Sequence, residues 1–184
     1  MVACGKGNSA TVSRLVQVPG LNINYQDGNG DTAAHLASRE GQTEYVRILA
    51  ETDRVDWNKR DEGGWTPLYW ALYRGHSDIV DIIVQQPNID YSVKTNIGST
   101  LAQIAVMRGK VKCVETLAAQ ERFDCWNVPD SDGDTPIMMA LNLKYGKREM
   151  TKILLRCPRV DLSCRDKEGW SLVFRAILRK ELGK

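Results

Sequence analysis

The sequence predicts an all-α solenoid, in which short helix–turn–helix units stack on one another and β-turn or hairpin fingers project to one side. The first observation is a period: Thr32, Thr66, Thr100 and Thr135 recur at spacings of 34, 34 and 35 residues. The second is that a glycine stands two residues before each of these threonines. The third is that each period holds two apolar segments of helical spacing, both too short to be stable alone.

The unit that runs from residue 61 to residue 94 shows the order of the elements. It opens on Asp-Glu-Gly-Gly, which is typical turn composition. Thr66, which precedes a proline, is expected to cap a first helix, and Gly75 to end that helix. A second helix is expected over residues 77–84, and Pro87 stops it before an extended return to the next turn.

This register divides the chain, taken as one domain over residues 1–184, into four full repeats with a half repeat at each end. The predicted boundaries are 1–26 for the N-terminal half repeat, 27–60, 61–94, 95–129 and 130–165 for the full repeats, and 166–184 for the C-terminal half repeat. One extra residue falls near Trp126, and two more lie between Ala140 and Gly146. Ends in mid-repeat indicate either a fragment of a longer array or an engineered scaffold.

The composition excludes several classes of protein. A net charge of +2 provides no basic excess for nucleic acid. No apolar run approaches the roughly 18 residues of a membrane span, and the N-terminus lacks the apolar core of a signal peptide. The five cysteines form no C-x-x-C pair, so neither a disulfide framework nor a zinc site is indicated. These features predict a monomer of the cytoplasm, with the nucleus as the alternative, that contacts neither nucleic acid nor membrane.

The sequence offers no catalytic or metal-binding constellation, so neither an enzyme nor a cofactor is expected. The two histidines, His35 and His76, both occupy positions of the repeat that favour a structural role. A set of periodic aspartates opens the turns, where a turn role is favoured over acid–base chemistry: Asp27, Asp61, Asp130 and Asp166. The acidic loop 130–134 is similar to the start of a calcium loop, but Leu141 stands where the loop would need a glutamate.

Two motifs of the second full repeat are specific. The segment Gly-Trp-Thr-Pro-Leu-Tyr-Trp-Ala (64–71) resembles the ankyrin signature G-x-T-P-L-H-x-A, and Gly-His-Ser-Asp-Ile-Val (75–80) resembles the second-helix motif G-H-x-x-I-V. The chain is thus similar to the ankyrin-repeat family over nearly its whole length. The family histidine is kept as His35 and replaced in the later repeats by Tyr69, Gln103 and Met138, where the sequence no longer predicts its usual hydrogen bond to a neighbouring turn.

The resemblance implies a protein–protein interaction module, because ankyrin proteins bind partners on a concave face formed by turn tips and first helices. The implied partner is an intracellular protein or peptide, bound mainly by the second and third full repeats. Aromatic residues, methionine and arginine are enriched in interface hot spots. The candidate binding residues of these types, with two isoleucines beside them, are Arg39, Trp65, Trp70, Tyr73, Arg74, Ile97, Ile104, Met107 and Arg108.

Two alternatives remain open from the sequence. Trp65 could fold onto the neighbouring turn and Trp70 could be covered by the next repeat, in which case neither would be exposed for a partner. The chain could also be a structural spacer of a longer ankyrin array, or an engineered scaffold with no natural partner. A second aromatic row near the extended returns is expected to pack between hairpins: Trp57, Tyr91 and Trp126.

Overall fold

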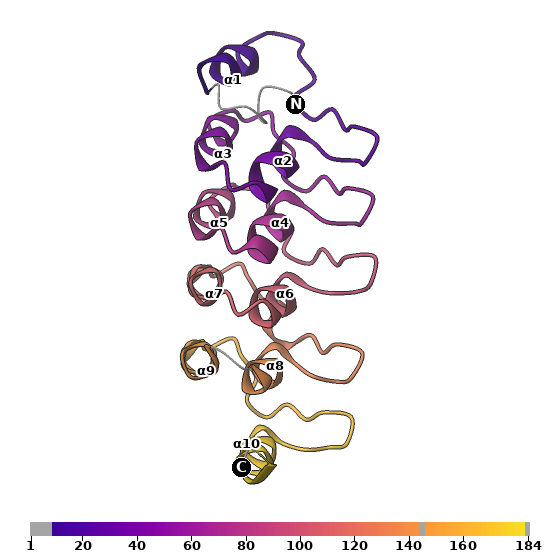
Figure 1. The fold of residues 1–184 in the computed structure, drawn as a ribbon, viewed down its shortest axis with the longest axis vertical. Coiled ribbons are helices and arrows are strands. Elements are labelled where there is room, and N and C mark those ends of the chain that lie inside the picture. Colours follow the sequence, from indigo (N-terminus) through magenta and orange to yellow (C-terminus); the bar gives the residue numbers. More distant parts are fainter. Residues whose placement is uncertain (1–8, 144–145, 183–184) are drawn as a thin grey trace. The chain divides into compact units, whose positions relative to one another are not determined.

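The computed structural model describes residues 9–143 and 146–182, and Figure 1 shows its helices. Within those residues every regular element is helical, apart from one isolated β-bridge between Arg165 and Ser171, so the all-α fold class is confirmed. The structure divides into two compact units. Unit 1 comprises residues up to Asp90 together with Lys94–Ile97, and unit 2 comprises Tyr91–Val93 and the residues from Gly98 onward.

Unit 1 contains five helices: α1 (Ser9–Val16), α2 (Ala33–Arg39), α3 (Thr43–Ala50), α4 (Pro67–Arg74) and α5 (Ser77–Val84). The second helices α1, α3 and α5 pack in one row, and the first helices α2 and α4 pack beside them in another (Figure 1). Each row buries the apolar face that a single short helix leaves uncovered. The predicted helix over residues 77–84 is confirmed by the bounds of α5.

Unit 2 repeats this arrangement with α6 (Leu101–Met107), α7 (Val111–Ala119), α8 (Pro136–Asn142), α9 (Lys147–Arg156) and α10 (Leu172–Leu182). The first helices α6, α8 and α10 pack in sequence, and α7 packs against α9. A short 3₁₀ helix, η2 (Cys125–Asn127), packs against α6 and α8 and contains the extra residue that the period revealed near Trp126. Residues 144–145, in the stretch that holds the two extra residues before Gly146, lie outside the described residues, and so does Cys4, one of the five cysteines.

The capping threonines explain where the first helices begin. The hydroxyl of Thr66 accepts a hydrogen bond from the backbone N–H of Tyr69, 3.2 Å away, and Thr32 and Thr100 cap their helices in the same way. Such a cap satisfies a backbone donor that the helix leaves free. Thr135 differs, because its side chain makes no cap bond and its hydroxyl instead lies 3.4 Å from the thiol of Cys164. Gly75 ends α4 with a φ of 85°, as expected.

The periodic aspartates build the hairpin fingers, which confirms their predicted turn role. In the second full repeat the backbone N–H of Asp61 donates to the carbonyl of Trp65 (3.0 Å), and the Asp61 carboxylate accepts from the N–H of Trp65 (2.9 Å). Equivalent pairs of bonds close the hairpins that Asp27, Asp130 and Asp166 open. Each carboxylate thereby holds the turn from inside, which makes it a structural group.

The returns carry a buried aromatic core, as expected for Trp57, Tyr91 and Trp126. In unit 2 the ring of Phe123 lies edge-on to Tyr91 at 5.3 Å and to Trp126 at 4.8 Å between centroids. Such edge-to-face pairs are favourable beyond the apolar area that they bury. Trp57 is also buried, within unit 1. Packing between neighbouring returns is therefore the role of this row.

Candidate functional site

The aromatic cluster of unit 1, which consists of Trp65, Trp70 and Tyr73, forms on α4 and on the finger that precedes it. The ring centroid of Trp65 lies 4.2 Å from that of Trp70 and 5.2 Å from that of Tyr73. All three residues are half-buried. The rings therefore pack on one another while each residue keeps part of its surface in solvent.

Hydrogen bonding fixes the orientation of Trp70. Its indole N–H donates to the second carboxylate oxygen of Asp61, 2.8 Å away. The first oxygen of the same carboxylate holds the hairpin. The finger and the helix are thus joined through one aspartate, which positions the indole before any partner arrives.

Two arginines flank Trp70. The guanidinium carbon of Arg39 lies 5.1 Å from the centroid of the Trp70 ring, and that of Arg74 lies 6.0 Å away, both within cation–π range. Arg39 also donates to the Oδ2 atom of Asp31 at 2.8 Å and lies 3.5 Å from a carboxylate oxygen of Glu40. The charge of Arg39 is therefore largely balanced within the chain, whereas Arg74 is exposed.

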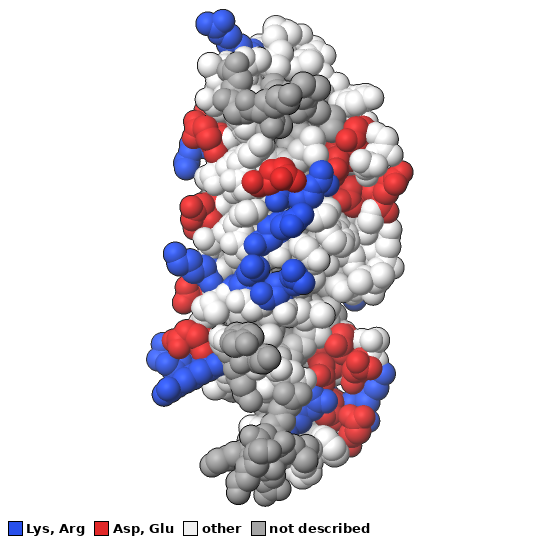
Figure 2. Space-filling model, in the orientation of Figure 1, with Lys and Arg blue, Asp and Glu red and all other residues white. Residues whose placement is uncertain are grey.

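A shallow pocket of about 280 Å³ opens beside the aromatic cluster. Its lining includes three acidic side chains and one arginine next to the two tryptophans: Asp31, Asp61, Glu62, Arg39, Trp65 and Trp70. Figure 2 shows Asp and Glu side chains gathered on the hairpin side of unit 1. The pocket is accordingly acidic as well as aromatic, a feature that the search for aromatic and basic residues in the sequence did not identify.

The remaining candidate residues differ in exposure. Ile97 is 85% exposed and belongs to unit 1, while Met107 is 56% exposed and belongs, with the exposed Arg108, to unit 2. Ile104 is only 7% exposed, so its expected place on a binding surface is wrong. The physical reason is that α6 is buried along almost its whole length, and Ile104 supplies core packing there.

His35 has the structural role expected of it. Its ring is buried and lies between the finger of its own repeat and the next: Nδ1 accepts from the N–H of Thr32 (3.1 Å), and Nε2 lies 3.0 Å from the carbonyl of Trp65. These two bonds require the neutral ring with its proton on Nε2. Burial lowers the pKa of His35 below its usual 6.5, although the Trp65 carbonyl and nearby aspartates oppose that shift.

Gln103, which stands at the histidine position of the third full repeat, makes two side-chain hydrogen bonds. Its side-chain oxygen accepts from the N–H of Thr100 (2.8 Å), and its side-chain nitrogen donates to the carbonyl of Val128 (3.1 Å). The first of these bonds is the one that His35 makes to Thr32, whereas the second reaches the return before the next finger instead of the finger itself, where His35 bonds Trp65. A link across to the neighbouring segment is therefore kept where the histidine is lost. An amide offers one acceptor and one donor, as the neutral imidazole does, which explains the exchange.

The other histidine, His76, links two repeats of unit 1. Its Nε2 lies 3.3 Å from the carbonyl of Arg39, and the ring fills the space beside Gly41. A side-chain carbon added at Gly41 would stand 2.7 Å from that ring. His76 thus has the structural role that was expected of it.

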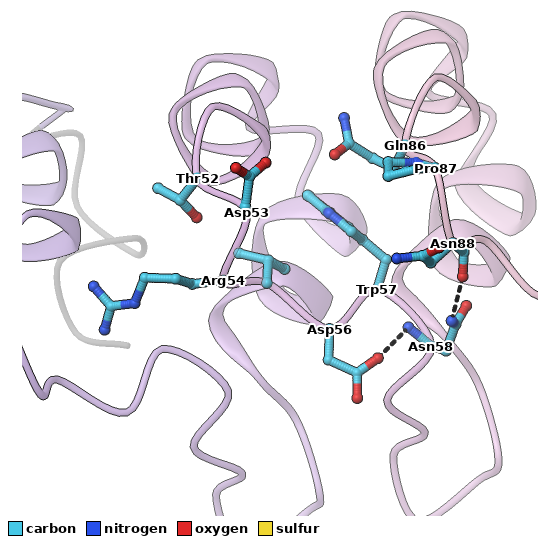
Figure 3. Close-up of a pocket in the computed structure, with 10 residues that line it drawn as sticks. Thr52, Asp53, Arg54, Asp56, Trp57, Asn58, Gln86, Pro87 and Asn88 are labelled. Atoms are coloured by element: carbon cyan, nitrogen blue, oxygen red, sulfur yellow. Dashed lines mark hydrogen bonds between the residues drawn. The ribbon is translucent and has the colours of Figure 1, made fainter.

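A second pocket of unit 1, of about 500 Å³, lies where α3 and α5 run into their returns (Figure 3). Its polar side chains are bonded within the chain: Asn58 donates from its side chain to the carbonyl of Asn88 (2.6 Å) and from its backbone to Asp56 (3.0 Å). Arg54 donates to the carbonyls of Val16 and Leu21. These groups join neighbouring segments of unit 1.

Unit 2 contains a charged arrangement that the sequence search missed. Arg175 on α10 donates from Nε to Asp166 at 2.6 Å and from Nη1 to the Oδ2 atom of Asp134 at 2.8 Å. Its Nη1 also lies 2.6 Å from Oδ1 of Asp134, close enough for an ion pair but outside hydrogen-bonding geometry. Burial alone would raise the pKa of Asp166, but the N–H of Trp170 and the guanidinium of Arg175 lower it below its usual value.

Neither a metal site nor a membrane span emerges from the part of the chain that the structure describes. No group of histidine, cysteine, aspartate and glutamate side chains in residues 9–143 and 146–182 is arranged to hold a metal ion. No helix in those ranges is both long enough and apolar enough to cross a membrane.

The comparisons agree with this architecture. The family model for ankyrin repeats (3 copies) matches residues 1–95 and 88–166. The crystal structure of EF0377, an ankyrin repeat protein, superimposes with a TM-score of 0.86 at 18% identity, and the match covers 98% of this chain and 91% of that one. An identity this low supports the fold alone. No curated protein matches the sequence.

The chain therefore belongs to the ankyrin-repeat family, since the family model covers most of its length. Ankyrin repeats are generally protein–protein interaction modules, and the fold is typically non-enzymatic. The class of function thus follows from the fold, while the binding surface and the partner must be argued from particular side chains.

Proposed function

We propose that this chain binds an intracellular partner protein or peptide through the face made by its hairpin fingers and first helices, the concave face of the family, with the aromatic cluster as the centre. The observation that carries the proposal is the half-buried stack of Trp65, Trp70 and Tyr73, flanked by Arg39 and Arg74. Tryptophan, tyrosine and arginine dominate the hot spots of protein interfaces.

Further exposed side chains of the third full repeat stay candidates for partner binding. Ile97 is exposed in unit 1, and Met107 and Arg108 are exposed in unit 2. Because Asp61 already fixes the indole of Trp70, little ordering is required when a partner binds. This preorganisation favours binding to a defined segment of the partner.

The chemistry of the cysteines supports an intracellular setting. The described cysteines Cys113, Cys125, Cys157 and Cys164 are all free, and three of them are buried. Free thiols fit the reducing conditions of the cytoplasm or nucleus better than an oxidising compartment. We expect the chain to bind its partner there as a monomer.

Peptide-library selection against the 184-residue chain, followed by calorimetry of the selected peptide, tests the proposal. Trp65→Ala, Trp70→Ala and Tyr73→Ala are each expected to weaken binding about 30-fold or more, because truncation of a hot-spot residue costs about 2 kcal/mol or more. Thermal unfolding of each variant shows whether the fold is kept.

Trp170→Ala is the matched control, since Trp170 is exposed in unit 2 and precedes Ser171 as Trp65 precedes Thr66. It should leave the affinity for the peptide unchanged. Unchanged binding by all three cluster variants, with their folds intact, would show that the site is wrong. A large drop in melting temperature on each change would instead favour packing as the role of the cluster.

A further inference from the structure

The register of the repeat relates the pocket of unit 1 to the charged arrangement of unit 2. Arg175 stands four residues after Ser171, and Trp70 stands four residues after Thr66, so the two occupy the same place in their repeats. Asp31 and Asp134 are equivalent because each directly precedes its threonine, and Asp61 and Asp166 both open the finger of the repeat that follows. The two places can therefore be compared atom by atom, each within its own unit.

In unit 2 an arginine fills the position between the two aspartates. Arg175 binds Asp166 through Nε and Asp134 through Nη1, and its side chain is only 17% exposed. Asn142 donates to the Oδ2 atom of Asp134 at 3.3 Å as well. Asp134 thus shares its carboxylate between a helix residue of its own repeat and the guanidinium from the next.

In unit 1 only part of this arrangement is present. The indole of Trp70 takes the place of Nε of Arg175 and binds Asp61, while Arg39, which is equivalent to Asn142, binds Oδ2 of Asp31. Among the described residues, no arginine from the following repeat takes the place of Nη1 of Arg175. The Oδ1 atom of Asp31 has no hydrogen-bond partner there, although the Asp31 side chain is only 2% exposed. Oδ1 of Asp134 also makes no hydrogen bond, but the Arg175 guanidinium lies 2.6 Å from it.

An unpaired buried carboxylate oxygen is energetically costly, so it favours any donor that can reach it. Asp31 lines the pocket of about 280 Å³, together with the carboxylates of Asp61 and Glu62. The pocket therefore offers three negative charges against the one positive charge of Arg39. Trp65 and Trp70 add aromatic rings, against which a planar guanidinium packs well.

We propose that this pocket takes the guanidinium of an arginine side chain from the partner, in the place that Arg175 fills from within the chain in unit 2. The arginine would share the carboxylate of Asp31 with Arg39, as Arg175 shares that of Asp134 with Asn142. Its charge would be balanced by Asp61 and Glu62 and its plane covered by the tryptophans. This inference rests on the proposed function and specifies the chemistry of the partner segment.

Two cations close to the pocket would repel the guanidinium of an incoming arginine. Arg39 and Arg74 both lie over the Trp70 ring, and a third guanidinium is repelled by each of them. Arg39 is offset by its ion pairs with Asp31 and Glu40. Arg74 is exposed, and its charge is screened by solvent and salt.

Titration of the full chain with N-acetyl-arginine methylamide tests the inference, with the side-chain N–H resonance of Trp65 followed by NMR. The citrulline analogue is the matched neutral ligand, and the lysine analogue tests the need for a planar group. We expect saturable shifts with arginine and about 30-fold weaker binding of both analogues, because loss of one partner of a desolvated charge pair costs at least that much.

Three variants and one control complete the experiment. Asp31→Asn should weaken arginine binding about 30-fold, and Trp70→Arg should abolish it, because the new side chain would fill the pocket as Arg175 does. Glu62→Gln, at an exposed position of the lining, should weaken binding to a smaller extent and remains informative if Asp31→Asn unfolds. Asp53→Asn removes an equal charge at the other pocket of unit 1 and should change nothing.

The outcomes separate this inference from the proposed function. Equal binding of arginine and citrulline, equal binding of arginine and lysine, or full binding by the Trp70→Arg chain would overturn the arginine pocket. If in addition Tyr73→Ala still weakens the selected peptide, the aromatic cluster remains a partner surface and only the arginine assignment fails. If Trp65→Ala, Trp70→Ala and Tyr73→Ala all leave the binding of the selected peptide unchanged as well, both proposals fail.

Discussion

At the scale of single residues, one repeat position is served by two different side chains. His35 and Gln103 each accept from the backbone N–H of a capping threonine and donate to a backbone carbonyl nearby, which is that of Trp65 in the next finger for His35 and that of Val128 in the return for Gln103. The histidine makes these bonds only as the neutral ring, whereas the amide makes them at any pH. The position therefore requires an acceptor and a donor at fixed separation rather than a histidine.

His35→Gln is expected to remove a pH dependence of stability. Because burial lowers the pKa of His35 in the folded state, the unfolded chain takes up a proton first as the pH falls below 6.5. The contribution of His35 to stability is therefore complete above pH 6.5 and declines below it. Urea unfolding at pH 7.5 and pH 5.5 should show this loss in the wild type and a smaller one in the variant.

The two stabilities should be similar at pH 7.5, since glutamine can accept from the threonine N–H and donate to a nearby backbone carbonyl, as Gln103 does. His35→Ala is the contrasting variant, and we expect it to cost about 1–3 kcal/mol at either pH because it leaves a buried donor and acceptor unpaired. An unchanged pH dependence in His35→Gln would show that another group is responsible.

At the scale of elements, the fingers depend on glycine for two separable reasons. Gly30 and Gly98 occupy the same place in their repeats and both have positive φ, 74° and 81°. A side-chain carbon added at Gly30 would stand 2.9 Å from the backbone nitrogen of Glu62, while one added at Gly98 would meet nothing within 4 Å. Gly30 is therefore needed both for its left-handed backbone conformation and for the close approach of the next finger. Gly98 is needed for the left-handed conformation alone.

Gly30→Ala should therefore destabilise the protein more than Gly98→Ala. We expect about 1–2 kcal/mol for the left-handed conformation at both positions, and at Gly30 a further 1–3 kcal/mol or so for the crowding. The comparison of free energies of unfolding from chemical denaturation measures the difference. Equal losses would mean that the neighbouring finger moves aside freely.

The buried aromatic residues of the returns are the second element on which the stability of the fold depends. Trp126 is fully buried in η2 and lies against Phe123, which in turn contacts Tyr91. Trp126→Ala is expected to cost about 3–5 kcal/mol, as large-to-small changes of buried aromatic residues do. Loss of the near-ultraviolet circular dichroism of this cluster at a lower denaturant concentration would report it, and Tyr25→Ala, at a residue 62% exposed, is the neutral control.

At the scale of the whole molecule, residues at the same repeat position are buried to different extents in different repeats and therefore contribute differently to stability. Leu72 on α4 is fully buried, while Ile177, six residues after Ser171 as Leu72 is six residues after Thr66, is 58% exposed on α10. Val173 and Phe174 are exposed as well, although the equivalent Leu68 and Tyr69 are buried. Burial in a repeat array comes from neighbours, so identical patterns stabilise by different amounts.

Leu72→Ala is accordingly expected to cost about 2–5 kcal/mol and Ile177→Ala no more than about 0.5 kcal/mol. Denaturant unfolding of the two variants tests this, and hydrogen exchange should show faster opening of α10 than of α4. A large loss of stability in Ile177→Ala would mean that α10 is covered in solution.

Much of the architecture followed from the sequence. The period set the helix pairs, the capping threonines and the aspartate turns, because these depend on local backbone chemistry that repeats along the chain. The retained bond at Gln103 and the burial of Ile104 did not follow, since each depends on which neighbour lies opposite. The sequence search also placed aromatic and basic side chains on the surface but did not bring Asp31, Asp61 and Glu62 into the same pocket.

The sequence by itself thus determined the repeat, the family and the side chains from which a binding surface would be made. The tertiary structure alone decided that Arg39 is paired with Asp31, that one buried oxygen of Asp31 makes no hydrogen bond to the described residues, and that Arg175 fills the equivalent place in unit 2. The reason is physical: propensity and capping act within a few residues, whereas a pocket and its charge arise from fingers and helices of successive repeats.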